Sequence, residues 1–126
     1  MKLRCVVIDD EPIARKGMEE YVADVPYLSH VGSFESAADA KVYLSDYPVD
    51  LMLLDIRMPK QSGIDFLKEL HDPPLVIFTT AYPQHALESY ELNVIDYLVK
   101  PISPGDLIRL CKSIRLFSIE EPSNRT

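Results

Sequence analysis

Three acidic residues and one lysine stand directly after apolar stretches of this chain. Asp9 and Asp10 follow residues 3–8, Asp55 follows residues 51–54, and Lys100 follows residues 97–99. Close carboxylates repel one another unless a cation neutralises them, and a site made of oxygen ligands suits Mg²⁺, with Mn²⁺ as a substitute. A lysine and a divalent cation are two of the groups that hold phosphoryl oxygens. These residue types therefore predict a cation-binding cluster that handles phosphate.

A hydroxyl group completes the set of groups that bind a phosphoryl group. Thr79 and Thr80 end the apolar stretch that starts at residue 75, so either could supply it. A single aspartate is more often a turn or helix cap, and a single lysine is more often an ion-pair partner. Three acids at strand ends of one sheet make a metal site the better interpretation.

The composition is that of one globular domain without a membrane segment. The chain has 126 residues, of which 47% are hydrophobic and 26% charged. No apolar run approaches the roughly 20 residues that span a bilayer. The first apolar run is too short for a signal peptide and leads directly into Asp9, Asp10 and Glu11. We therefore expect a cytoplasmic protein with no membrane contact.

The charge argues against direct nucleic-acid binding, and the cysteines and histidines argue against a zinc site. The formal net charge is −7, and phosphate neutralisation dominates nucleic-acid affinity, so we expect no direct binding of DNA or RNA by this domain. Cys5 and Cys111 fall at apolar positions and are expected as buried thiols. The three histidines lack zinc-ligand spacing and are expected as ordinary side chains: His30, His71 and His85.

Short apolar runs alternate with amphipathic segments along the chain. The apolar runs predict strands at residues 3–8, 28–34, 49–54, 75–79 and 95–99. Helical periodicity predicts helices at residues 12–23, after Ser36, after Gly63, at 85–92 and after Ser103. The helix starts are marked by Pro12, by Ser36 with Asp39, and by Ser103 with Pro104 and Asp106.

The third of these helices follows a break in the pattern at residues 58–63. Its apolar face is expected to consist of Ile64, Leu67 and Leu70, with Phe66 at its margin. The preceding strand is apolar without sustained alternation, as is typical of a parallel strand covered on both faces.

Strict alternation of strands and helices predicts an α/β fold, a doubly wound (βα)5 flavodoxin-like sandwich. Right-handed crossovers and short connections favour a five-stranded parallel sheet in the order 2-1-3-4-5. In such sheets ligands bind beyond the carboxyl ends of the strands, near the point where the strand order reverses. Strands one and three are neighbours there, so Asp9, Asp10 and Asp55 should converge.

Four short motifs at strand ends point to a known family. They are Asp9-Asp10-Glu11, Asp55 within Leu-Asp-Ile-Arg-Met-Pro, Thr80-Ala81, and Lys100-Pro101. Each motif alone is weak, but the four in this order are highly specific. Over residues 2–119 the chain resembles the receiver domain of two-component response regulators.

Further segments make the resemblance more particular. Residues 78–82, 86–88 and 96–101 are similar to receivers joined to LytTR-type DNA-binding domains, which often work with LytS-like histidine kinases. The resemblance implies a receiver at residues 1–119, followed at 120–126 by a tail or the start of a linker to an output domain that regulates transcription.

The resemblance also implies a role for each site residue. Asp55 would take a phosphoryl group from a sensor histidine kinase as an aspartyl phosphate. Such a domain is not classed as an enzyme, although it assists its own phosphotransfer and slow dephosphorylation. The metal ligands would be Asp9, Asp10, Asp55 and the backbone carbonyl of Arg57. Lys100, the Thr80 hydroxyl and the Ala81 amide would bind phosphoryl oxygens. The Lys100-Pro101 bond would be cis.

The switch that this family uses would involve Tyr97. A half-buried strand aromatic is common, but the resemblance implies a ring that turns inward when Thr80 moves toward the phosphoryl group. That motion would alter the face made by the fourth helix, fifth strand and fifth helix, through which two receivers pair on phosphorylation. Arg57 and Tyr82 each lie two residues beyond a site residue, and we hypothesise that they slow hydrolysis of the phosphoaspartate.

Three other functions can be weighed against this one. A flavodoxin-like FMN carrier would need a phosphate-cradling loop where Asp9, Asp10 and Glu11 stand. A metal-dependent phosphatase with an aspartyl-phosphate intermediate is the stronger rival, but it would carry its nucleophile after the first strand and need a cap insertion. A receiver-shaped module that is never phosphorylated would not need the full set of acids, hydroxyl and lysine.

Overall fold

The computed structural model describes residues 2–82, 84, 94, 96–103, 105, 106, 109, 110 and 112. Its described strands form one five-stranded parallel sheet in the order β2-β1-β3-β4-β5. The strands are β1 (Leu3–Ile8), β2 (Leu28–Phe34), β3 (Leu51–Asp55), β4 (Leu75–Thr80) and β5 (Asp96–Val99). The predicted fold class and strand order are confirmed. The predicted helix at 85–92, Cys111 and the tail at 120–126 lie outside the described residues.

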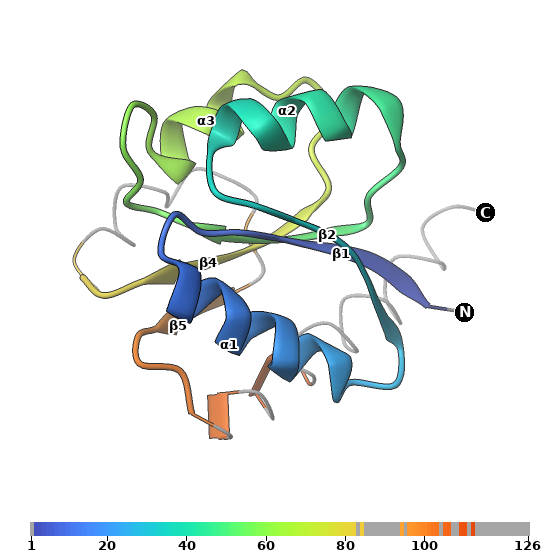
Figure 1. The fold of residues 1–126 in the computed structure, drawn as a ribbon, viewed down its shortest axis with the longest axis vertical. Coiled ribbons are helices and arrows are strands. Elements are labelled where there is room, and N and C mark those ends of the chain that lie inside the picture. The colour runs from blue at the N-terminus through green and yellow to red at the C-terminus, as the bar shows by residue number, and fades with distance from the viewer. Residues whose placement is uncertain are drawn as a thin grey trace.

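Helices cover both faces of the sheet (Figure 1). One face is covered by α1 (Pro12–Ala23), and the opposite face by α2 (Ala37–Asp46) and α3 (Gly63–Glu69). The last predicted helix is described at Gly105, Asp106, Arg109, Leu110 and Lys112, which are helical.

Alternation along the strands divides the core into two clusters, one on each face. In β1, Val6 and Ile8 belong to the cluster under α2 and α3, whereas Cys5 and Val7 belong to the cluster under α1. Successive strand residues point to opposite faces, so one apolar run supplies both layers. Every residue of β3 is buried, as expected for a central strand with helices on both faces.

Side-chain caps mark the start of α2, of α3 and of the last helix. The Ser36 hydroxyl accepts the N–H of Asp39, and the Ser62 hydroxyl accepts that of Asp65. At the start of the last helix, the Ser103 hydroxyl accepts the Asp106 N–H while the Asp106 carboxylate accepts the Ser103 N–H. This reciprocal pair satisfies backbone donors that have no partner within the helix.

Phe66 corrects one expectation. It is fully buried in the cluster under α2 and α3, whereas the sequence pattern placed it at the margin of the apolar face. The helix is only 7 residues long, and four of them are buried, so its apolar face is wider than the spacing of Ile64 and Leu67 indicates. Cys5, which was expected as a buried thiol, lies fully buried in the cluster under α1, and this burial raises the pKa of its thiol to about 12.

The amino end of the sheet is closed by an ion pair between β1 and the residue before β3. Asp50 accepts hydrogen bonds from the Arg4 backbone N–H (2.7 Å), Nε (2.9 Å) and a terminal guanidinium nitrogen (3.1 Å). The Asp50 N–H donates in return to the Arg4 carbonyl at 2.8 Å.

In the part of the chain that the structure describes, no helix combines the length and apolar character needed to cross a bilayer.

Candidate functional site

The three acids meet at the carboxyl edge of the sheet, where β1 and β3 lie side by side. Asp9 and Asp10 follow β1, Asp55 ends β3, and each offers a carboxylate oxygen within 4.8 Å of the other two. Asp9 is 4% and Asp55 3% exposed, so both charges lie largely outside water. The predicted convergence of these residues is confirmed.

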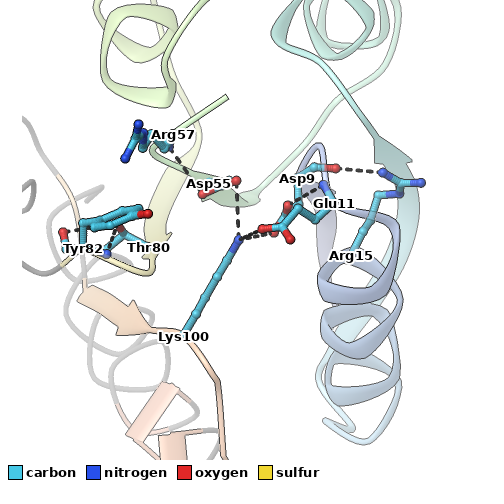
Figure 2. A network of polar contacts seen from close by, with 8 residues as sticks. All are labelled: Asp9, Glu11, Arg15, Asp55, Arg57, Thr80, Tyr82 and Lys100. Atoms are coloured by element: carbon cyan, nitrogen blue, oxygen red, sulfur yellow. Dashed lines mark hydrogen bonds and ion pairs between the residues drawn. The ribbon is translucent and has the colours of Figure 1, made fainter. Parts of the chain in front are cut away.

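Lys100 reaches this cluster from β5, the outermost strand on that side of the sheet. It follows β5, and its side chain extends past the end of β4 toward the acids (Figure 2). Its Nζ lies 2.8 Å from an Asp9 oxygen, 3.4 Å from an Asp55 oxygen and 3.8 Å from a Glu11 oxygen. The Lys100-Pro101 bond is cis, as the resemblance implied, and the Lys100 N–H donates to the Thr80 carbonyl.

The loop after β1 holds Asp9 through several hydrogen bonds. Its N–H donates to the Phe34 carbonyl at 3.0 Å, which ties the loop to the end of β2. Its carboxylate accepts the Glu11 N–H at 2.9 Å, and its carbonyl accepts the Arg15 guanidinium at 2.8 Å. The position of this carboxylate is therefore set by the strand, the loop and the first turn of α1 together.

The loop after β3 holds Asp55 from the other side. The Arg57 N–H points at an Asp55 oxygen at 3.4 Å, and the Gly63 N–H donates to the Ile56 carbonyl at 2.7 Å. A Cβ at Gly63 would lie 2.2 Å from the Asp55 carbonyl oxygen, so this close approach requires glycine. Lys60 in the same loop has φ 69°, a conformation that non-glycine residues adopt uncommonly.

The electrostatics show that the cluster holds more negative than positive charge. Burial, and then the Asp9 charge, raise the pKa of Asp55 to about 7, although Lys100 acts in the opposite direction. Burial lowers the pKa of Lys100, but the hydrogen bond to Asp9 and the nearby acids outweigh burial and raise it overall. One lysine does not neutralise three acids, which leaves an excess of negative charge at this site.

The residues present fit a hard divalent cation such as Mg²⁺. The donors are carboxylate oxygens, the ligands that Mg²⁺ prefers. Asp10 and Asp55 line a pocket of about 460 Å³ that leaves room for water and a phosphate group. Arg57, which was expected to offer its carbonyl, lines the same pocket with Ala81 and Tyr82.

The two threonines at the end of β4 have different surroundings. Thr79 faces a second pocket of about 600 Å³ that α1 also lines. The Thr80 hydroxyl accepts the Tyr82 N–H at 2.9 Å and donates to the Tyr82 carbonyl at 3.3 Å. The Tyr82 ring lies under the Arg57 guanidinium, 4.8 Å from the guanidinium carbon to the ring centroid, so the loops after β3 and β4 meet beside the pocket that Asp55 lines.

Tyr97 lies on β5, away from the acids. Its ring stacks on Phe78 with 6.2 Å between centroids, and its carbonyl accepts a hydrogen bond from Arg109. It is half-buried against the cluster under α2 and α3. Most of the two helices of its predicted output face lies outside the described residues.

The family follows from comparison with known proteins. The model of the response regulator receiver domain matches residues 5–112, a range that holds every acid of the cluster and Lys100. The chain belongs to this family. Receiver domains are parts of two-component response regulators, so the predicted family is confirmed.

Individual relatives agree with this assignment. An uncharacterized response regulatory protein of Vibrio cholerae is 37% identical over 87% of this chain and 44% of its own length. The sensory transduction protein LytT of Enterococcus faecalis is 35% identical over 79% of this chain and 42% of its own length. The REC domain of AraT from Geobacillus stearothermophilus is 27% identical, with a TM-score of 0.84 over 96% of this chain and 99% of that one. The chain thus spans about half the length of the curated relatives.

Three contacts of the site were not predicted from the sequence. Glu11 contacts Lys100, Arg15 donates to the Asp9 carbonyl, and Gly63 closely approaches Asp55. A basic residue in the first turn of a helix is a signal that could have indicated Arg15, because it opposes the helix dipole. Gly63 was assigned only to a break in the pattern, since a close backbone contact between distant residues leaves no periodicity.

Proposed function

We propose that Asp55 accepts a phosphoryl group and that this domain is the phosphorylated switch of a two-component system. The observation that carries the proposal is a nearly buried carboxylate at the end of the central strand, next to two further acids and a lysine. A nucleophile on a buried strand is held in one position, which favours an in-line displacement.

In the proposed reaction an Asp55 oxygen attacks the phosphorus of a phosphohistidine. The O–P bond forms as the N–P bond breaks, and the bonding electrons remain on the imidazole, which then takes a proton. Lys100 already lies 3.4 Å from Asp55 and would pair with a phosphoryl oxygen. The Thr80 hydroxyl would have to leave Tyr82 to bind another, beside the Ala81 amide.

The metal ion would be Mg²⁺ or Mn²⁺, and its ligands would be Asp9, Asp10, Asp55 and the Arg57 carbonyl. When bound, the ion would neutralise the acids and the developing charge on the phosphoryl oxygens. The all-oxygen donor set and the raised pKa of Asp55 support this assignment.

Intact-mass measurement with Mg²⁺ and acetyl phosphate tests the proposal. The parent chain should gain one phosphoryl mass, Asp55→Ala none, and the exposed control Asp46→Ala the same as the parent. Absence of the adduct in the parent would overturn the proposal. Multiple turnover of p-nitrophenyl phosphate would instead support the rival phosphatase.

Arg57 and Tyr82 are proposed to lengthen the life of the phosphoaspartate. Their side chains meet across the pocket in which a water molecule would approach Asp55. Decay of the adduct should therefore quicken in Arg57→Ala and Tyr82→Ala and stay unchanged in Lys60→Ala, a neighbouring exposed lysine. Unchanged decay in both of the first two variants would end this part of the proposal.

The partners are proposed from the relatives. Since the chain spans about half the length of proteins such as LytT, we propose a receiver at 1–119, a tail or the start of a linker at 120–126, and an output domain of the LytTR DNA-binding type. The donor would be a LytS-like histidine kinase. Phosphorylation would act through Thr80 and Tyr97 and favour pairing of two receivers, which light scattering before and after acetyl phosphate would measure.

A further inference from the structure

Arg15 is bound to the acidic loop in a way that the proposed reaction does not require. It lies in the first turn of α1, and its guanidinium donates to the Asp9 carbonyl at 2.8 Å (Figure 2). It therefore holds the backbone of Asp9, whereas Lys100 contacts the carboxylates themselves. Arg15 thus restrains the main chain of Asp9 without occupying its carboxylate.

The place of Arg15 is unfavourable for the helix alone. A cation in the first turn faces the positive end of the helix dipole, and α1 has no acidic residue in that turn to offset it. The helix also lacks a side-chain cap, because its N-cap residue Glu11 makes no such hydrogen bond. A residue that breaks a local rule is expected to have a compensating role elsewhere.

We propose that Arg15 is a positioning residue for the metal site: it holds Asp9 in place as a ligand. This inference rests on the proposed function, since it assumes that the acids bind Mg²⁺. The Asp9 N–H donates to Phe34, its carboxylate accepts the Glu11 N–H and its carbonyl accepts the Arg15 guanidinium, so three hydrogen bonds restrain this loop. Loss of the guanidinium removes one of these restraints, and outer contacts of this kind tune metal affinity.

Charge and position predict opposite results for this residue. As a positive charge beside the acids, Arg15 repels Mg²⁺, so its removal would tighten binding. As a positioning residue it favours binding, so its removal weakens it. The sign of the change therefore distinguishes the two roles.

The test measures the Kd of Mg²⁺ by isothermal titration calorimetry for the parent chain, Arg15→Met and Lys16→Met. Lys16 is the matched control, because it is the next residue of α1 and is exposed. We expect Arg15→Met to bind about tenfold more weakly and Lys16→Met to bind as tightly as the parent or slightly tighter. Thermal unfolding without metal records the effect of each substitution on stability separately.

Tighter or unchanged binding by Arg15→Met would overturn the inference, even if the variant is less stable. If Arg15→Met does not fold, Arg15→Lys decides, since it keeps the charge but not the guanidinium fork. A Kd raised about threefold or more supports positioning, and an unchanged Kd overturns it. A parent chain that binds no Mg²⁺ would overturn the proposed metal site as well, so the two failures are distinguishable.

Discussion

The two edges of the sheet each place an acid beside a cation where β1 and β3 are neighbours. At the amino edge Asp50 meets Arg4, and at the carboxyl edge Asp55 and Asp9 meet Lys100. The first pair is partly exposed, with 47% of the Arg4 side chain and 30% of the Asp50 side chain accessible. At the second edge Lys100 is 15% accessible and the two acids less.

The two edges shift the pKa of an aspartate in opposite directions. Hydrogen bonds from Arg4 lower the pKa of Asp50, while burial and the Asp9 charge raise that of Asp55 to about 7. One acid with one guanidinium forms a closed pair, whose role is to join two segments of the sheet. Three acids with one lysine leave a charge for a ligand to neutralise, and that excess distinguishes the candidate site from a structural ion pair.

Removal of Lys100 should have the largest effect on stability and is the strongest test of the difference between the two edges. Lys100→Met leaves the buried acids without their cation, so we expect the free energy of unfolding to fall by about 3 kcal/mol at pH 8 with EDTA. Addition of Mg²⁺ should restore most of the loss, which urea denaturation with and without the ion would measure. A loss that Mg²⁺ does not reverse would argue against the acids as a cation site.

Replacement of one acid at each edge should give effects of opposite sign. A rise of the Asp55 pKa from 3.8 to about 7 corresponds to at most about 4 kcal/mol of unfavourable charge at pH 8. Asp55→Asn removes this unfavourable charge but also weakens hydrogen bonds of the carboxylate. We therefore expect a smaller net gain, a stabilisation of the metal-free protein by about 2 kcal/mol. Asp50→Asn should destabilise it. Urea denaturation of both variants checks the signs, and equal signs would remove the distinction.

The pH dependence sharpens the comparison further. Because the folded-state pKa of Asp55 is raised, its penalty is absent below about pH 4, grows as the pH rises to about 7, and is constant above that. The contribution of Asp50, whose pKa is lowered, is present above its unfolded pKa and lost as the pH falls through its folded pKa. Unfolding free energies of the parent and of Asp55→Asn should therefore converge toward pH 4 without metal.

The smallest effect is expected at the amino edge. Arg4→Met should lower stability slightly at low salt, and 1 M NaCl should abolish most of the difference, because salt screens an exposed pair. The Lys100→Met loss should persist in the same salt, since the side chains of Lys100, Asp9 and Asp55 are largely buried. Equal salt sensitivity of the two losses would contradict the contrast in burial.

The sequence predicted the sheet order and the acid cluster because both depend on short-range patterns. Asp9, Asp10 and Asp55 follow apolar runs, and parallel topology then brings strand ends together. The contacts of Arg15 and Gly63 were not predicted, because they depend on how a helix and a loop pack on the end of a strand. Phe66 was misplaced for a related reason, since a short helix between two layers can bury more than one stripe.

The central strand has one further consequence. Asp55 belongs to a strand whose five residues are all buried and which is paired on both sides, and backbone amides of such strands exchange with solvent only in rare openings. A phosphoryl group on Asp55 would therefore be attached to a strand whose amides exchange slowly, while the loops around it adjust. On phosphorylation, amide hydrogen exchange rates would then change in the loop residues and stay the same in β3.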